Sequence, residues 1–357
     1  MSFFPIVDAH EDLAFNGLLY GRDYRRSAYA IRKDEAAADS RDGRRGRCML
    51  GVPELLEAQV AVVFATIYTL PATHAEKGEH GYNSSQEAQA EALRQFALYE
   101  RWIAEDARLG WVRNRAELKA LLARQQNALE PQVGVVLLIE NADCITQLSE
   151  VGEWYERGVR IIGPAWHRNA YTGSSGEPGP LTEAGRALLG EMKRAGLALD
   201  ISHMSDEAMR EALDLYHGPV CSSHANPRAV ADRPRQLPSW ALEELGRRGG
   251  VAGIMPVNWA LDPEWQPQHG KARVGLARVA AAIQAAAEIA GGYRFVGIGS
   301  DFDGGFGAES CPEKIETVGD LGSVAQALSD AGVPETDIGA VMGGNWLRWL
   351  ETLLPEG

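Results

Sequence analysis

The chain has 357 residues, of which 45% are hydrophobic, and its formal net charge is −14. This length suits one α/β barrel with insertions, and the hydrophobic fraction is sufficient for a large buried core. The negative charge argues against a nucleic-acid partner, because such a partner requires a basic face.

The cysteines and the first residues bear on where the protein works. Four cysteines occur without paired spacing, which argues against a disulfide framework or a cysteine-built zinc site and favours a reducing compartment. The chain starts with no basic segment followed by an apolar one, and no run is long enough to cross a bilayer. We therefore expect a cytoplasmic protein without membrane contact.

Eight short runs rich in Val, Ile, Leu and Ala predict strands that are buried on both faces. They are residues 4–10, 60–68, 133–140, 159–166, 197–203, 219–224, 251–257 and 295–301. Helical patterns lie between them, at residues 86–107, 115–127, 145–157, 181–195, 206–216, 239–248 and 272–290. Repeated strand-then-helix units indicate a parallel sheet, and eight units indicate an α/β fold closed into a (β/α)8 barrel of the TIM type, with residues 1–357 as one domain.

Two segments fall outside this regular pattern. Residues 17–50 form a long connection crowded with arginines and acidic residues. We expect either a solvated excursion or a lid or dimer flap over the barrel mouth, since long loops on this face tend to carry function. Residues 319–354 predict a C-terminal extension of two or three helices. The last of these has an apolar stripe that is typical of packing rather than binding, formed by Trp346, Leu347, Trp349, Leu350 and Leu353.

Six of the eight predicted strands end on a residue that can bind a metal ion or polarise a bond beside one. These residues are His10 with Asp12, Glu140, His167, His203, His224 and Asp301. In a parallel barrel the carboxyl ends of the strands open onto one face, where such folds carry out their chemistry. The pattern predicts a metallohydrolase.

Each candidate metal ligand has a structural alternative. His10 and Asp12 are two apart in an extended segment, so both can reach one ion, although a capping pair would give the same pattern. Glu140 closes a very apolar strand, where a bound cation would offset the cost of burying a carboxylate; the alternative is a structural ion pair. His203 and His224 supply neutral nitrogen donors suited to zinc, and the alternative is a pair of core histidines.

Together these five residues suffice for two ions that share one carboxylate. His10, Asp12 and Glu140 would hold one ion, and Glu140, His203 and His224 would hold the other. Two ions about 3.5–4 Å apart can hold a bridging hydroxide and polarise a carbonyl group. The pKa of a zinc-bound water falls to about 7, so hydroxide is available at neutral pH.

Other residues could handle the substrate. Asp301, in GIGSDFDGG, could accept the proton of the bridging water and pass it to the leaving amine. His167 could hydrogen-bond the carbonyl oxygen as charge builds there, or it could be a packing histidine. An arginine after His224 could bind a substrate carboxylate through its guanidinium fork, and the candidates are Arg228, Arg233 and Arg235.

Several polar residues are assigned structural roles or none. Asp303 is interpreted as a loop-capping residue, and Ser205 as the cap of a helix. We assign no role to His74, His80, His217 and His269. Because the chain has no Gly-x-Ser-x-Gly motif, nothing supports a serine nucleophile.

At these positions the chain resembles the membrane (renal) dipeptidase family of zinc peptidases, within the amidohydrolase-like barrels, over nearly its whole length. VDAHEDL is similar to the first-strand His-x-Asp motif of that family, and LIENAD to its bridging glutamate segment. DISHMS and SSHANPRA are similar to its two histidine motifs, and GIGSDFDG to its closing aspartate motif. Segment 17–50 and the stretch AWHRNAYTGSSGEPGP resemble a bacterial branch.

The resemblance implies a fold, an activity and a set of site residues. It implies two Zn²⁺ ions per chain, held by His10, Asp12, Glu140, His203 and His224. It also implies that Asp301 handles protons, that His167 stabilises the developing oxyanion, and that Arg235 binds the terminal carboxylate of the substrate. The implied activity is hydrolysis of dipeptides, often with a D-residue on the C-terminal side, and a homodimer is compatible with the resemblance.

Two other functions remain open. The same ions could serve a hydrolase of cyclic amides, N-acyl amino acids or lactones, which would not require a free α-amino group on the substrate. A catalytically silent barrel used for binding is the third possibility, and the complete set of ligand residues argues against it. Both enzyme functions take a small molecule as the partner.

Overall fold

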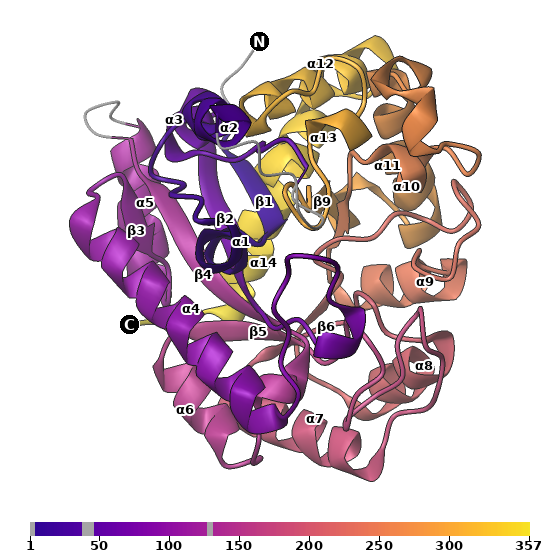
Figure 1. The fold of residues 1–357 in the computed structure, drawn as a ribbon. Helices are drawn as coiled ribbons and strands as arrows, with labels where there is room; N and C mark the ends of the chain where they lie inside the picture. Colours follow the sequence, from indigo (N-terminus) through magenta and orange to yellow (C-terminus); the bar gives the residue numbers. More distant parts are fainter. Residues whose placement is uncertain (1–3, 38–45, 127–130) are drawn as a thin grey trace.

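The computed structural model describes residues 4–37, 46–126 and 131–357, which form a barrel of parallel strands surrounded by helices (Figure 1). Neighbouring strands follow the order β7-β6-β5-β4-β2-β1-β9-β8. A parallel bridge between Ser222 and Ala252 then links the β7 and β8 ends of this order. The strands are β1 (Ile6–Glu11), β2 (Val60–Tyr68), β3 (Leu109–Trp111), β4 (Val133–Glu140), β5 (Val159–Gly163), β6 (Ala198–Asp200), β7 (Val220–Cys221), β8 (Ala252–Ile254) and β9 (Val296–Ile298).

The (β/α)8 prediction is confirmed, and each of the eight predicted strands is present. One short strand was not predicted. Strand β3 pairs with β4 beside the barrel path, in a register that places Leu109 opposite Val133. Three residues give too short an apolar run to be recognised in a sequence, because their strand geometry depends on the neighbouring strand.

Helices in the predicted intervals have boundaries that shift by a few residues, and helices at residues 13–20, 28–37 and 258–261 were not predicted. The described residues form fourteen α-helices in all. They are α1 (Leu13–Tyr20), α2 (Ala28–Ala37), α3 (Val52–Glu57), α4 (Ser85–Glu105), α5 (Arg115–Gln126), α6 (Glu150–Glu156), α7 (Glu183–Ala195), α8 (Asp206–Leu215), α9 (Ser239–Arg248), α10 (Asn258–Leu261), α11 (Leu276–Ala290), α12 (Gly322–Asp330), α13 (Glu335–Gly339) and α14 (Asn345–Leu353). Ser205 caps α8 as expected, because its hydroxyl accepts a hydrogen bond from the Ala208 amide at 3.2 Å. None of these helices combines enough length with enough apolar residues to span a membrane.

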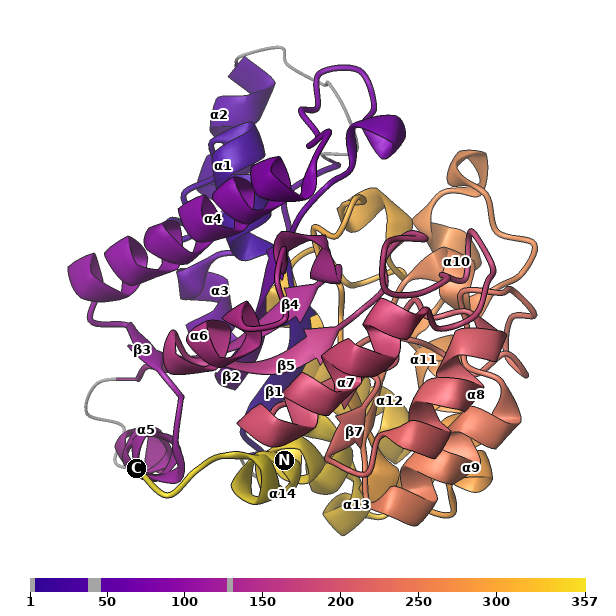
Figure 2. The same cartoon turned by 90° about the horizontal axis from the view of Figure 1, so that it is seen from below.

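The C-terminal helix α14 fills the barrel end at which β1 begins (Figure 2). Trp346 is fully buried among inward-facing strand residues such as Val7 and Phe64, and its indole nitrogen donates a hydrogen bond to the Ile298 carbonyl at 2.9 Å. A Cβ on Gly297 would lie 2.2 Å from this indole, so the close approach requires glycine there. The predicted packing role of the apolar stripe is confirmed, and α14 is the floor of the barrel.

Segment 17–50 contains more regular structure than a long loop. Within its described part, α1 extends to Tyr20 and α2 occupies Ala28–Ala37, a run in which alanine and other strong helix formers predominate. Residues 38–45, which include three of the arginines, lie outside the described residues. Arg22 is buried and lies 3.3 Å from a carboxylate oxygen of Asp303, so this segment is fixed to the loop that follows β9.

Candidate metal centre

The predicted metal ligands lie together where the strands end. His10 belongs to β1, Asp12 precedes α1, and Glu140 is the last residue of β4. His203 and His224 follow β6 and β7 by three residues each. His203 has a φ of 64°, an unusual backbone conformation for a residue other than glycine, and such residues cluster at functional sites.

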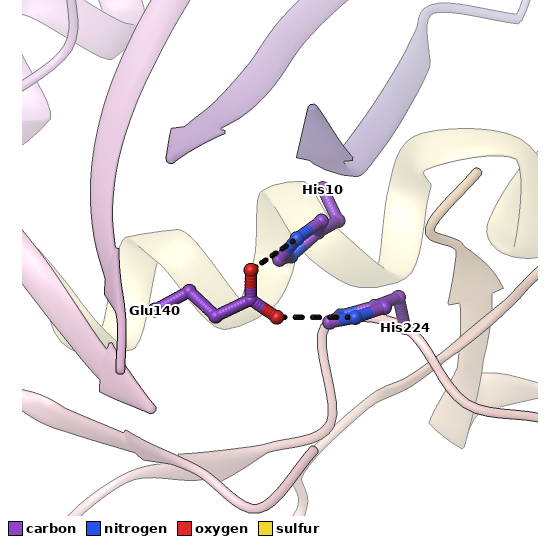
Figure 3. Close-up of side chains that lie close together, drawn as sticks. All are labelled: His10, Glu140 and His224. Carbon is purple, nitrogen blue, oxygen red and sulfur yellow. Dashed lines mark ion pairs between the residues drawn. The ribbon is translucent and has the colours of Figure 1, made fainter. Parts of the chain in front are cut away.

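Glu140 lies between the histidines and directs its two carboxylate oxygens to different rings (Figure 3). Oε2 lies 3.5 Å from Nε2 of His10. Oε1 lies 3.0 Å from Nε2 of His203 and 3.5 Å from Nε2 of His224. Asp12 joins the first set, with a carboxylate oxygen 3.9 Å from Nε2 of His10. A carboxylate between two donor sets is the arrangement that two neighbouring cations require.

Within the described chain, two buried polar atoms of this cluster lack hydrogen-bond partners, and a bound metal ion would supply the missing interaction. Nε2 of His10 and Oε1 of Glu140 are buried, and neither has a hydrogen-bond partner among the described residues. A buried polar atom without a partner is costly, and coordination of a cation removes that cost. In two sets of residues the potential ligand atoms all lie within 4.8 Å of one another. One set is His10, Glu140 and His224, and the other is His10, Asp12 and Asp301.

The carboxylates and His10 stabilise one another as charged groups. Burial opposes the imidazolium form of His10, but the negative charges of Glu140 and Asp12 outweigh it and raise the pKa of His10 to about 10. Burial would raise the pKa of Glu140, yet His10 and His203 hold it well below its usual range. Burial and the neighbouring charge of Glu140 raise the pKa of Asp12 to about 6. These shifts show a concentrated negative charge that attracts cations.

The two later histidines favour their neutral form. Burial and the positive charge of Arg235 lower the pKa of His203 to about 4. Burial and the charge of His10 lower the pKa of His224 well below its usual value. Neutral imidazoles are the form that binds metal ions, so His203 and His224 need lose no proton to do so near pH 7.

Asp301 and Asp303 follow β9 and have different surroundings. Asp301 faces the centre, with Oδ1 4.0 Å from Nε2 of His10, and burial raises its pKa well above the usual value. A Cβ on Gly304 would lie 1.9 Å from Oδ1 of Asp301, so glycine leaves room for this carboxylate. Asp303 is buried, accepts a hydrogen bond from Tyr24 at 2.9 Å and pairs with Arg22. Its interpretation as a structural loop residue agrees with these contacts.

Only one of the three candidate arginines reaches the centre. Arg235 donates through Nη2 to Nε2 of His203 at 3.0 Å and to the His224 carbonyl at 2.8 Å. Its Nη1 is buried, and the described residues provide no hydrogen-bond partner for it. Arg228 binds Asp206 with both terminal nitrogens, and Arg233 donates to a backbone carbonyl.

His167 belongs to a neighbouring polar cluster. Its Nε2 lies 3.1 Å from a carboxylate oxygen of Asp143 and 3.0 Å from the hydroxyl of Tyr82. Trp166, the residue before it, lines the cavity above the centre. The predicted contact between His167 and the substrate carbonyl therefore requires its ring nitrogen to leave Asp143 or Tyr82.

Sequence reasoning did not identify the polar residues behind the ligands. Asp200 ends β6, and Ser223 immediately precedes His224; both are buried and hydrogen-bonded to each other. Thr66 of β2 donates a short hydrogen bond to Asp12. A signal was present, because Asp200 and Ser223 lie within the two histidine motifs, but the contact between them joins different strands.

A cavity of about 450 Å³ opens over Glu140, His203, His224, Arg235 and Asp301. This volume is in the range of small-molecule sites. Much of its wall is aromatic, a feature that the sequence did not reveal because the rings come from distant segments. The rings belong to Phe15, Tyr20, Tyr68, Trp166, Trp259, Trp265 and Phe306.

Comparison with known proteins adds to this geometry. A family model described as membrane dipeptidase (peptidase family M19) matches residues 1–353. Dipeptidase aclJ of Aspergillus oryzae is 35% identical over 202 residues, which are 55% of this chain and 46% of that protein. Dipeptidase 3 of Mus musculus is 27% identical over 216 residues, 57% of this chain and 41% of that protein. The matches therefore span about half the length of these curated relatives.

A solved structure extends the likeness to the whole fold. It is a metallo peptidase from Rhodobacter sphaeroides, liganded with a phosphinate mimic of the dipeptide L-Ala-D-Ala. The two chains are 23% identical and have a TM-score of 0.79, and the alignment covers 99% of this chain and 100% of the other. At this identity the likeness establishes a common fold.

Proposed function

The chain belongs to the membrane dipeptidase family, peptidase family M19, and from this premise we propose that it is a dipeptidase that uses two zinc ions per chain. His10, Asp12 and Glu140 hold one ion, and Glu140, His203 and His224 hold the other. The observation that carries the proposal is the division of the Glu140 oxygens between His10 on one side and the two later histidines on the other. When bound, such ions supply a water of lowered pKa as nucleophile and a Lewis acid for the carbonyl oxygen.

Arg235 binds the terminal carboxylate of the dipeptide in this proposal. Its unpartnered Nη1 can donate to a carboxylate oxygen, while the bond from Nη2 to the His224 carbonyl holds the guanidinium in place. The aromatic walls exclude water and accept apolar side chains of different sizes. This geometry favours a short substrate whose free carboxylate lies close to the scissile bond.

Asp301 transfers the proton of the attacking water to the leaving amine. Its carboxylate faces the centre, and burial favours the protonated form, so it can take a proton at Oδ1 and donate it to the leaving amine. His167 donates a hydrogen bond from Nε2 to the carbonyl oxygen after exchanging Asp143 or Tyr82 for the substrate. We further place the protein in a reducing cytoplasm, where the four buried cysteines would remain free thiols as they are here.

A substrate panel tests the proposal. Purified protein loaded with zinc is assayed against L,L-dipeptides, dipeptides with a C-terminal D-residue, and the matching N-acetyl amino acids. We expect hydrolysis of the dipeptides and tolerance of the D-residue, because the Rhodobacter sphaeroides protein accommodates a mimic of L-Ala-D-Ala. Hydrolysis of the N-acetyl compounds without hydrolysis of dipeptides would contradict the dipeptidase assignment. Protein that binds no zinc under zinc-replete conditions would contradict the metal centre itself.

A further inference from the structure

A single buried hydroxyl contacts ligands from both halves of the metal centre. Oγ of Ser223 lies 3.1 Å from Nδ1 of His10 and 2.7 Å from Nδ1 of His224. It also donates to Oδ2 of Asp200 at 2.5 Å. All four residues are at most 1% exposed, so water does not compete for these bonds.

The positions of the protons follow from counting donors and acceptors. A serine hydroxyl has one proton to donate and two lone pairs to accept with. The carboxylate of Asp200 has only acceptors to offer: its Oδ1 receives the backbone amides of Ser202 at 3.0 Å and Ser223 at 2.9 Å, which leaves Oδ2 for the hydroxyl. The hydroxyl proton of Ser223 therefore points to Oδ2 of Asp200. Towards His10 and His224 the same oxygen can only accept, so each ring must carry a proton on Nδ1.

This arrangement directs the opposite nitrogen of each ring into the centre. Nε2 of His10 faces Oε2 of Glu140 at 3.5 Å, and Nε2 of His224 faces Oε1 at 3.5 Å. The two rings lie close together, with centroids 3.6 Å apart, so one oxygen can serve both. A ring whose Nδ1 donates a hydrogen bond presents the lone pair of Nε2 to a metal ion.

The geometry points to Ser223 as a positioning residue that, held by Asp200, fixes the ring orientation and proton position of one histidine ligand in each half of the metal centre. The inference rests on the proposed function, since it concerns the same ligands. The consequence is that the two metal sites are coupled. A change of one side chain outside the ligand set lowers the metal affinity of both sites.

Ser223→Ala in the full chain tests this role, with Ser222→Ala as the matched control. Ser222 is equally buried and adjacent, and its hydroxyl bonds to Ser202, 3.0 Å away, rather than to a ligand. Chelator competition measures the affinity for the first and the second zinc ion. In Ser223→Ala we expect both affinities to fall by about 10–100-fold, the usual effect of removing a partner behind a ligand. If both affinities match those of Ser222→Ala, or if only one falls, the shared role is overturned.

Asp200→Asn provides a second test that preserves side-chain shape. Its amide oxygen would keep the two backbone amides, which turns the NH2 group towards Oγ of Ser223. The hydroxyl then donates to Nδ1 of His224 at 2.7 Å, its nearest acceptor, in preference to Oγ of Ser202 at 3.4 Å. The His224 ring must then carry its proton on Nε2. Long-range ¹H–¹⁵N spectra of the His224 ring in metal-free protein should show its proton on Nδ1 in the wild type and on Nε2 in Asp200→Asn.

The two readouts separate this inference from the proposed function. Unchanged ring spectra in Asp200→Asn would overturn the role of Ser223 even if the wild type binds two ions. A wild type that binds no zinc would contradict the proposed function. If Ser223→Ala does not fold, as judged by circular dichroism, the spectra of Asp200→Asn decide the matter.

Discussion

Oε1 of Glu140 lies 3.0 Å from Nε2 of His203, and this short approach leaves the other carboxylate oxygen free to face His10 on the opposite side. Because one side chain serves both donor sets, the two proposed zinc ions depend on the same residue. The fold produces this arrangement because β4 lies between β1 and the strands β6 and β7 in the barrel order, with β2 and β5 as its direct neighbours.

Glu140→Gln is therefore expected to lose more metal than a change at any other single ligand. The amide can offer an oxygen to one donor set but must turn its NH2 group towards the other. We expect fewer than two zinc ions per chain after dialysis, measured by elemental analysis. Glu150→Gln, which alters a carboxylate bonded to Thr146 away from the centre, should retain the wild-type content. Equal zinc in the two variants would contradict the bridging role.

Asp301→Asn should separate chemistry from metal binding. Loss of a general acid–base group lowers turnover by about 10²-fold or more, while the proposed ligands remain in place. The measurement is kcat on a dipeptide together with the zinc content of the same sample. Asp303→Asn is the comparison: it removes charge from the pair with Arg22 and should lower thermal stability more than kcat. Wild-type turnover in Asp301→Asn would show that the proton passes through another group.

Arg235→Lys should weaken recognition of the substrate carboxylate. Lysine keeps the positive charge but loses the planar fork, so we expect KM for a dipeptide to rise by about 10-fold or more. The same dipeptide with an amidated C-terminus should show little difference between the variant and the wild type. Arg228→Lys, in the same segment but bound to Asp206, provides the control. An equal KM increase for both substrates would indicate that Arg235 acts on the metal centre through His203 and not on the carboxylate.

His167→Ala should lower kcat with little effect on KM if the ring contacts the carbonyl oxygen during reaction. Removal of one donor to an oxyanion costs about 10²–10³-fold in kcat. His74→Ala is a suitable control, because this ring lies 5.3 Å from the His167 ring and has no proposed contact with the substrate. If the two variants have the same kcat, His167 serves the cluster with Asp143 and Tyr82 alone.

Trp346→Ala tests the floor of the barrel. Truncation of a large buried aromatic residue typically costs about 3–5 kcal/mol of unfolding free energy, and urea denaturation measures the loss. Leu347→Ala, at a partly buried position in the same helix, should cost less. The zinc content of folded Trp346→Ala should stay at the wild-type level, because the indole packs with Val7 and Phe64 and donates to the Ile298 carbonyl rather than to a proposed ligand. An unchanged denaturation midpoint would contradict the packing role.

The barrel and the clustering of the candidate ligands could be predicted because both depend on local patterns. Each strand is a short apolar run, and each ligand is the polar residue at which such a run stops, as with Glu140 after VGVVLLI. Parallel topology then brings those ends together without further information. Arg235 was different: the residues alone left three arginines after His224, and the family resemblance pointed to Arg235. The folded loop shows that Arg228 and Arg233 bind elsewhere.

Other features depend on contacts between distant segments. Strand β3 exists because of β4, and the bond between Ser223 and Asp200 depends on the alignment of β6 with β7, in which Asp200 lies opposite Cys221. Helix α2 was not predicted, because the many arginines and acidic residues of segment 17–50 indicated a solvated connection. The structure shows that one of those arginines, Arg22, is buried instead.

Helix α14 has a consequence for synthesis on the ribosome. Its indole rings complete a core that begins with Val7 in the first strand, so the two ends of the described chain must meet before the barrel is closed. The nascent barrel therefore remains open underneath until residue 353 has left the exit tunnel, with apolar strand faces exposed to other proteins. Chaperone demand should peak after β9 has been made and before α14 has emerged, when the sheet is present but its last apolar surface is still uncovered.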